Sequence, residues 1–195
     1  MQEAEKKPEK PKTSEKILQA AFECLSARGY ANVSMRNIAV EAGVALGQVT
    51  YYYRNKETLF LEVIHMMMCQ VLNEAEGKLD SASGKQKLGA LIGFFQGLIQ
   101  DNPKLFKLFI DFTAQALWNP SFREQLDSLN RRLTALIERK LAINTKTDKR
   151  YHGYSSQSVA KLILGALYGT STQILLGYDK DDSFEALFLA DSLLN

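Results

Sequence analysis

The chain has 195 residues, of which 46% are hydrophobic and 24% charged, and its formal net charge is +2. These values are ordinary for a globular protein of one or two domains. No apolar run reaches the roughly 18 residues that a membrane span needs, and the Lys/Glu/Pro-rich N-terminus is unlike a signal peptide, so we expect a cytoplasmic protein with no membrane partner.

The chain begins with a polar segment, residues 1–12, in which lysines and glutamates nearly cancel. We expect a disordered, solvated tail here in preference to an arm that contacts a nucleic acid. The first apolar pattern follows from Ser14 to Gly29, where hydrophobic side chains recur at helical spacing and Gly29 is a typical helix stop. This pattern predicts one amphipathic helix.

Two short helical patterns joined by a glycine-containing turn follow in residues 34–54. Ser34 is a good N-cap for the first of them, and the amides near it also suit a phosphate. A turn such as the one at Gly43 sets a second helix across the first at roughly 90–120°, as in a helix-turn-helix. We expect residues 13–58 to form a three-helix DNA-binding domain.

The second of these helices, Gly47 to Arg54, has Val49 as its only plainly aliphatic residue. A structural helix would bury a fuller apolar stripe. Gln hydrogen-bonds an adenine edge, a Thr methyl contacts a thymine methyl and Tyr hydroxyls hold phosphates, so the set suits the major groove. The residues expected to contact DNA are Ser34, Met35, Arg36, Ala45, Gly47, Gln48, Thr50, Tyr51, Tyr52 and Lys56.

The net charge does not by itself indicate a DNA-binding protein. Between residues 14 and 56, five basic side chains stand against three acidic ones. Attraction to DNA therefore has to be local, and Arg36, Arg54 and Lys56 are placed to supply it.

Residues 14 to 60 resemble the TetR family of bacterial transcriptional regulators. The resemblance is carried by an ordered series: Ile17-Leu18, Ala20-Ala21, Gly29-Tyr30, Val33-Ser34, Ile38-Ala39, Ala42-Gly43-Val44, Gly47, Val49, Tyr52, and Lys56-Glu57 with Leu59. Ala45 departs from it, since the family usually has Ser or another cap there, and Thr50 stands where the family usually has Tyr. We expect the lost cap to weaken the start of the recognition helix by about 1 kcal/mol.

The rest of the chain, residues 59–195, is expected to be a helical lobe, which the resemblance implies is an effector-binding and dimerisation domain. Helices are predicted at Lys56 to Lys78, Lys85 to Gln100, Pro103 to Trp118, Phe122 to Leu141, Ser156 to Leu176 and Ser183 to Leu194, with a polar loop at Asn144 to Ser155. No segment alternates with period two, so we expect an all-α fold.

Aromatic side chains gather on the helices predicted between residues 85 and 118. Such a stripe is often plain hydrophobic core, and that interpretation stays open. The resemblance implies an inducer cavity among these helices, and aromatic walls with a few polar groups suit a small apolar ligand. The candidate effector-pocket residues are Phe95, Phe109, Phe112, Trp118 and Tyr168.

Gly165 and Gly169 lie four residues apart in the next-to-last predicted helix, a spacing that lets another backbone approach closely. The resemblance implies that the last two helices pair with the same two helices of a second subunit, while packing within one chain is the alternative. The candidate interface residues are Leu162, Gly165, Ala166, Gly169, Phe184 and Phe188.

Cys24, Cys69, His65 and His152 form no recognisable metal site, and no nucleophile-base pair or cofactor motif is visible, so we expect no enzyme, metal or cofactor. We expect a homodimeric, sequence-specific regulator, a repressor released from a palindromic double-stranded DNA operator by a small, largely apolar effector. The alternative is a TetR-like helical protein-interaction module without operator binding.

Overall fold

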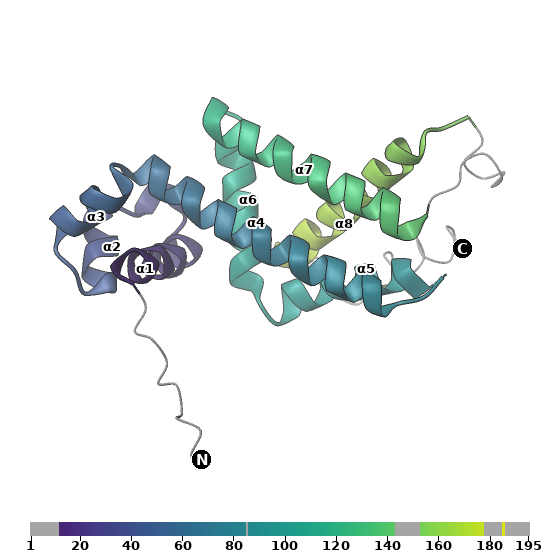
Figure 1. Ribbon diagram of the computed structural model, residues 1–195, viewed down its shortest axis with the longest axis horizontal. Helices are drawn as coiled ribbons and strands as arrows, with labels where there is room; N and C mark the ends of the chain where they lie inside the picture. The colour runs from purple at the N-terminus through teal and green to yellow at the C-terminus, as the bar shows by residue number, and fades with distance from the viewer. Residues whose placement is uncertain (1–11, 85, 143–152, 178–184, 186–195) are drawn as a thin grey trace, which may run out of the picture. The chain divides into compact units, whose positions relative to one another are not determined.

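The computed structural model describes residues 12–84, 86–142, 153–177 and 185, and the statements below concern these residues. They form eight α-helices and one short 3-10 helix, and this described part contains no strand (Figure 1). The expected all-α fold is confirmed. The chain divides into two compact units, Met1–Val63 and Ile64–Asn195, which we treat separately.

The first unit contains three helices and the start of a fourth (Figure 1). Its elements are α1 (Thr13–Arg28), the 3-10 helix η1 (Tyr30–Asn32), α2 (Met35–Ala42), α3 (Leu46–Tyr53) and the first residues of α4 (Lys56–Ser81). α2 packs against both α1 and α3. The most deeply buried side chains come from all four α-helices and form one apolar core: Ile17, Ala21, Leu25, Ile38, Val49, Leu59 and Phe60.

The α2–turn–α3 segment has the caps that its sequence predicts. The Ser34 hydroxyl accepts a hydrogen bond from the Asn37 amide at 3.2 Å, and the Asn37 side chain accepts one from the Ser34 amide at 2.9 Å. At the other end, Gly43 has φ +65° in the left-handed region, and the Val44 amide donates to the Ala39 carbonyl at 3.0 Å. Glycine adopts this backbone without strain, which ends α2 and directs the chain into α3.

The second unit contains the remainder of α4 and four further helices. They are α5 (Gln86–Gln100), α6 (Pro103–Ala116), α7 (Pro120–Leu141) and α8 (Ser156–Leu175). α8 packs against α5, α6 and α7. Pro103 and Pro120 each occupy a first helical position, where a missing amide costs nothing. The end of α7 is tied to α4, because Lys140 pairs with Asp80 at 2.5 Å and with Glu76 at 3.1 Å.

Several sequence predictions lie outside the described residues: most of the tail at 1–12, most of the loop at 144–155, the helix at 183–194, and with it Phe184 and Phe188. Cys24 and Cys69 are free thiols, and burial raises the pKa of Cys24. Among the helices that the structure describes, none combines the length and the hydropathy of a bilayer-crossing segment.

Candidate DNA-binding surface and ligand cavity

α3 turns nearly all of its side chains to solvent. Its one buried residue is Val49, which anchors the helix in the core of the first unit. Tyr51 is 81% exposed. The exposed residues of α3 include all of those expected there to contact DNA: Gly47, Gln48, Thr50, Tyr51 and Tyr52. A short helix held by one buried side chain and showing a polar face is free to meet a partner surface.

The start of α3 lacks a side-chain cap at Ala45, as the sequence predicts, but Gln48 supplies the other half of a capping box. The Gln48 Oε1 atom accepts a hydrogen bond from the Ala45 amide at 3.2 Å. This contact pairs the Ala45 amide, not the helix amides that a Ser side chain would cap, and it fixes the orientation of the Gln48 side chain. The Gln48 amide group keeps its N–H donors, and its oxygen has a second lone pair.

Thr50 and the tyrosines also have defined surroundings. The Thr50 hydroxyl donates to the carbonyls of Gly47 at 3.1 Å and Leu46 at 3.3 Å, so its polar atom is used within the helix. The Thr50 methyl remains as its contact group. The rings of Tyr51 and Tyr52 meet edge to face with centroids 5.2 Å apart. An edge-to-face pair of exposed rings limits the positions that each hydroxyl adopts.

Lys56 lies in a different environment from the phosphate contact expected for it. Its ammonium donates to the carbonyl of Tyr30 at 2.7 Å and to that of Val33 at 2.9 Å, and it lies 4.1 Å from the centre of the Tyr30 ring. The Tyr30 ring in turn contacts Phe60, with centroids 4.6 Å apart. Lys56 therefore holds the segment before α2 against α4, a role that its place in the sequence did not reveal.

The end of α3 is fixed by Tyr53, which was not among the predicted site residues. Its hydroxyl donates to the carbonyl of Ser14 at 2.9 Å, and burial raises its pKa. Three consecutive tyrosines therefore divide their roles by helical position: Tyr53 ties α3 to α1, while Tyr51 and Tyr52 face solvent. On the N-terminal side, Ser34 and Arg36 are exposed and Met35 is half-buried at the start of α2.

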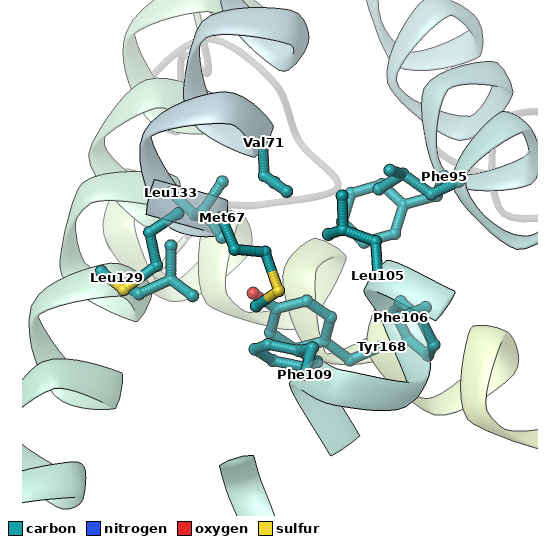
Figure 2. A pocket seen from close by; sticks show the side chains of 11 residues that line it. Met67, Val71, Phe95, Leu105, Phe106, Phe109, Leu129, Leu133 and Tyr168 are labelled. Atoms are coloured by element: carbon teal, nitrogen blue, oxygen red, sulfur yellow. The ribbon is translucent and has the colours of Figure 1, made fainter. Parts of the chain in front are cut away.

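The second unit contains a small apolar cavity of about 30 Å³ (Figure 2). Eleven residues from α4, α5, α6, α7 and α8 line it: Met67, Met68, Val71, Phe95, Leu98, Leu105, Phe106, Phe109, Leu129, Leu133 and Tyr168. Three of the five predicted pocket residues are therefore brought together. Helical periodicity found Phe95 and Phe109, but it did not find the methionines that α4 contributes.

The other two predicted pocket residues do not line this cavity. Phe112 is fully buried, but its ring packs on Phe122 with centroids 5.8 Å apart, so it belongs to the core between α6 and α7. Trp118 is 86% exposed and lies just beyond the end of α6 at Ala116. Phe112 and Trp118 are therefore not part of this cavity, and their assignment to an effector pocket stays a prediction.

α8 has one buried and one exposed face. Val159, Ile163, Leu167 and Ile174 are buried, whereas Leu162 is 69% exposed. The other predicted interface positions on α8, Gly165, Ala166 and Gly169, are exposed as well. A Cβ atom added at either glycine would meet nothing within 4 Å. Packing within the described part of the chain therefore does not explain this face.

Comparison with known proteins identifies the class of protein. Residues 17–63 match the family model described as bacterial regulatory proteins, tetR family. The fatty acid metabolism regulator protein of Bacillus subtilis (strain 168) is 23% identical over 189 residues, which are 96% of this chain and 94% of that protein.

Two solved structures share the fold. A transcriptional regulator from Saccharomonospora viridis in complex with choline has a TM-score of 0.76 at 18% identity, covering 89% of this chain and 92% of that one. The transcriptional regulator FadR from Bacillus subtilis in complex with stearoyl-CoA has a TM-score of 0.69 at 21% identity, covering 89% and 96%.

An N-terminal helix-turn-helix unit followed by an all-helical unit is the arrangement of a DNA-binding regulator. Residues 17–63 identify the first unit as the DNA-binding unit of the tetR family of bacterial regulatory proteins, and the fold of the rest of the chain is that of transcriptional regulators.

Proposed function

We propose that the protein is a cytoplasmic, homodimeric repressor that binds a palindromic operator and is released by a small, largely apolar effector. The observation that supports this proposal most directly is the exposed face of α3, where Gln48, Thr50, Tyr51 and Tyr52 stand around a single buried anchor, Val49. A protein-interaction module would not need this set of base- and phosphate-contacting groups.

The proposed contact of each side chain with DNA follows from the hydrogen bonds that the side chain already makes within the protein. Because the Gln48 oxygen holds the Ala45 amide, its N–H donors are directed to an acceptor on a base edge, such as a purine N7. The Thr50 methyl suits a thymine methyl. At the start of α2, the amides of Ser34 and Asn37 donate hydrogen bonds within the cap. A phosphate would therefore bind the backbone amides of Met35 and Arg36, together with the Arg36 side chain.

Dimerisation is proposed through the exposed face of α8. Leu162 and Ala166 supply apolar area, and Gly165 and Gly169 allow a second helix to approach closely. A single recognition helix reads too short a site for useful specificity, while a two-fold dimer reads two half-sites roughly 34–36 Å apart.

The effector is proposed to act through α4, which runs without a break from Lys56 to Ser81. Its first turns contribute Leu59 and Phe60 to the core of the first unit, and Met67 and Met68 line the cavity. The protein then has two states, one that binds DNA and one in which α4 is arranged differently. A ligand lowers DNA affinity only as far as it binds the second state more tightly than the first. The two similar structures contain stearoyl-CoA and choline, two ligands that differ widely in chemistry, so the shared fold does not by itself specify the effector.

A gel-shift assay with DNA from upstream of the protein's own gene tests the proposal. The wild type should bind this DNA more tightly than scrambled DNA. Tyr51→Ala, at an exposed position of α3, should lose most of this preference, whereas Tyr154→Ala, at an exposed position of the second unit, should keep it. Equal binding of the wild type to both DNAs would contradict operator recognition.

A further inference from the structure

Among the side chains that line the cavity, Tyr168 has the one strong hydrogen-bonding atom, its hydroxyl oxygen, which neighbouring side chains cover so that the surface of the empty space is wholly apolar. Figure 2 shows this oxygen pointing in among the lining side chains, beside Met67 and Phe109. The Tyr168 ring is fixed by two aromatic contacts, to Phe109 with centroids 4.8 Å apart and to Phe95 with centroids 5.9 Å apart. The hydroxyl therefore has a defined position that packing, and not hydrogen bonding, sets.

The Tyr168 hydroxyl is buried and has no hydrogen-bond partner within the described part of the chain. Burial raises its pKa well above the usual range, so the group is a neutral phenol and a hydrogen-bond donor. A buried donor without a partner is rare in native proteins, since the lost hydrogen bonds to water are not replaced. A bridging water does not solve this, because water in a cavity needs two to four polar partners and the lining offers one.

The walls around the hydroxyl exclude charged groups. Every other lining residue is aliphatic, aromatic or a thioether, so a carboxylate or an ammonium group would enter without a counter-charge. An aromatic cage for a quaternary ammonium is not formed either, because the Phe109 and Tyr168 rings lie 4.8 Å apart at 36° and contact each other.

We propose that the effector is an aliphatic compound with an uncharged oxygen, which accepts a hydrogen bond from the Tyr168 hydroxyl while the hydrocarbon part lies among the methionine, leucine and phenylalanine side chains. The oxygen belongs to a hydroxyl or to the carbonyl of an ester or thioester. The regulatory role of this ligand rests on the proposed function. Its binding in the cavity does not.

The cavity has to open for such a ligand. A volume of about 30 Å³ holds little more than one or two waters, whereas ligand sites are roughly ten times larger or more. Met67 and Met68 are the lining side chains best able to move, because an unbranched thioether adopts many rotamers at low cost. Both belong to α4, so the ligand enters by repacking the helix that continues into the first unit.

Calorimetric titration of the full-length protein, without DNA, tests this proposal with eight-carbon probes of equal chain length. Octanol and methyl octanoate are the neutral probes, and octanoate and octyltrimethylammonium are the charged ones. Tyr168→Phe removes only the hydroxyl, and Tyr154→Phe is the matched control because Tyr154 is exposed and lies outside the cavity.

We expect the neutral probes to bind the wild type at least about ten-fold more tightly than the charged ones. Tyr168→Phe should weaken the neutral probes by about two- to ten-fold, the effect of one net hydrogen bond, and Tyr154→Phe should leave them unchanged. Without ligand, Tyr168→Phe should melt no lower than wild type, since it removes an unpaired buried group. Octanoyl-CoA distinguishes two sources of the ligand. If octanoyl-CoA binds and the binding depends on Tyr168, the ligand is an acyl thioester. If octanoyl-CoA does not bind while octanol and methyl octanoate do, the ligand is a free neutral lipid.

Unchanged binding of octanol and methyl octanoate to Tyr168→Phe would overturn the proposal, and so would tighter binding of either charged probe. Because these titrations contain no DNA, such a result would not contradict operator binding. Tyr168-dependent binding in a protein that does not recognise its upstream DNA would instead overturn the proposed function and leave the ligand class standing.

Discussion

Replacing Lys56 by methionine distinguishes a structural role of this side chain from a phosphate contact. The Lys56 ammonium donates two hydrogen bonds to backbone carbonyls and lies over the Tyr30 ring. A hydrogen bond to a charged group contributes about 1.5–3 kcal/mol. Because Lys56 is half-buried, solvent screens part of this energy, and we expect Lys56→Met to destabilise the first unit by about 2–3 kcal/mol.

Hydrogen exchange without DNA measures this effect at the segment that Lys56 holds. Peptides covering residues 29–38 should exchange about 30- to 150-fold faster in Lys56→Met than in wild type. Lys16→Met, at an exposed position of α1, is the control and should change stability by less than about 0.5 kcal/mol. Exchange within about two-fold of wild type, together with a salt slope of DNA binding lowered by about one, would refute the structural role.

Three further predictions concern the other proposed sites. Gln48→Glu keeps an oxygen for the Ala45 amide but loses the N–H donors. In binding assays with single-base operator variants, discrimination at one position should fall by about 1–3 kcal/mol, while the melting temperature stays that of the wild type. Gly169→Leu should give monomers in sedimentation because overpacking a helix contact costs about 1–3 kcal/mol, while Gly93→Leu, at an equally open position of α5, should stay dimeric. Phe109→Leu should leave operator affinity near wild type and weaken release by the effector; reduced operator affinity with an intact ligand response would make Phe109 ordinary core.

The helices and the helix-turn-helix were predictable from the sequence because each has a local signal. Ser34 marks the start of α2, Gly43 its end, and Pro103 and Pro120 the first turns of α6 and α7. The exposure of α3 followed from its lack of apolar residues. Such signals act within a few residues and need no knowledge of the tertiary structure.

The remaining features depend on contacts between distant parts of the chain. The acceptors of Lys56 lie 26 and 23 residues away, at Tyr30 and Val33, and no periodicity indicates them. Trp118 lies beyond the end of α6, and helix ends are the least predictable part of a helical pattern. The lone hydroxyl of Tyr168 in an apolar lining became visible only when five helices were placed around it.

The most direct test of the account is a hydroxyl-radical footprint of the wild-type protein on its upstream DNA at physiological salt. If a two-fold dimer reads the operator with α3, two segments on one face of the duplex should be protected, with centres roughly 34–36 Å apart and related by two-fold symmetry. Protection should disappear with Tyr51→Ala and persist with Tyr154→Ala. Uniform coverage without defined segments, or protection that survives Tyr51→Ala unchanged, would contradict the claim that the exposed face of α3 reads an operator.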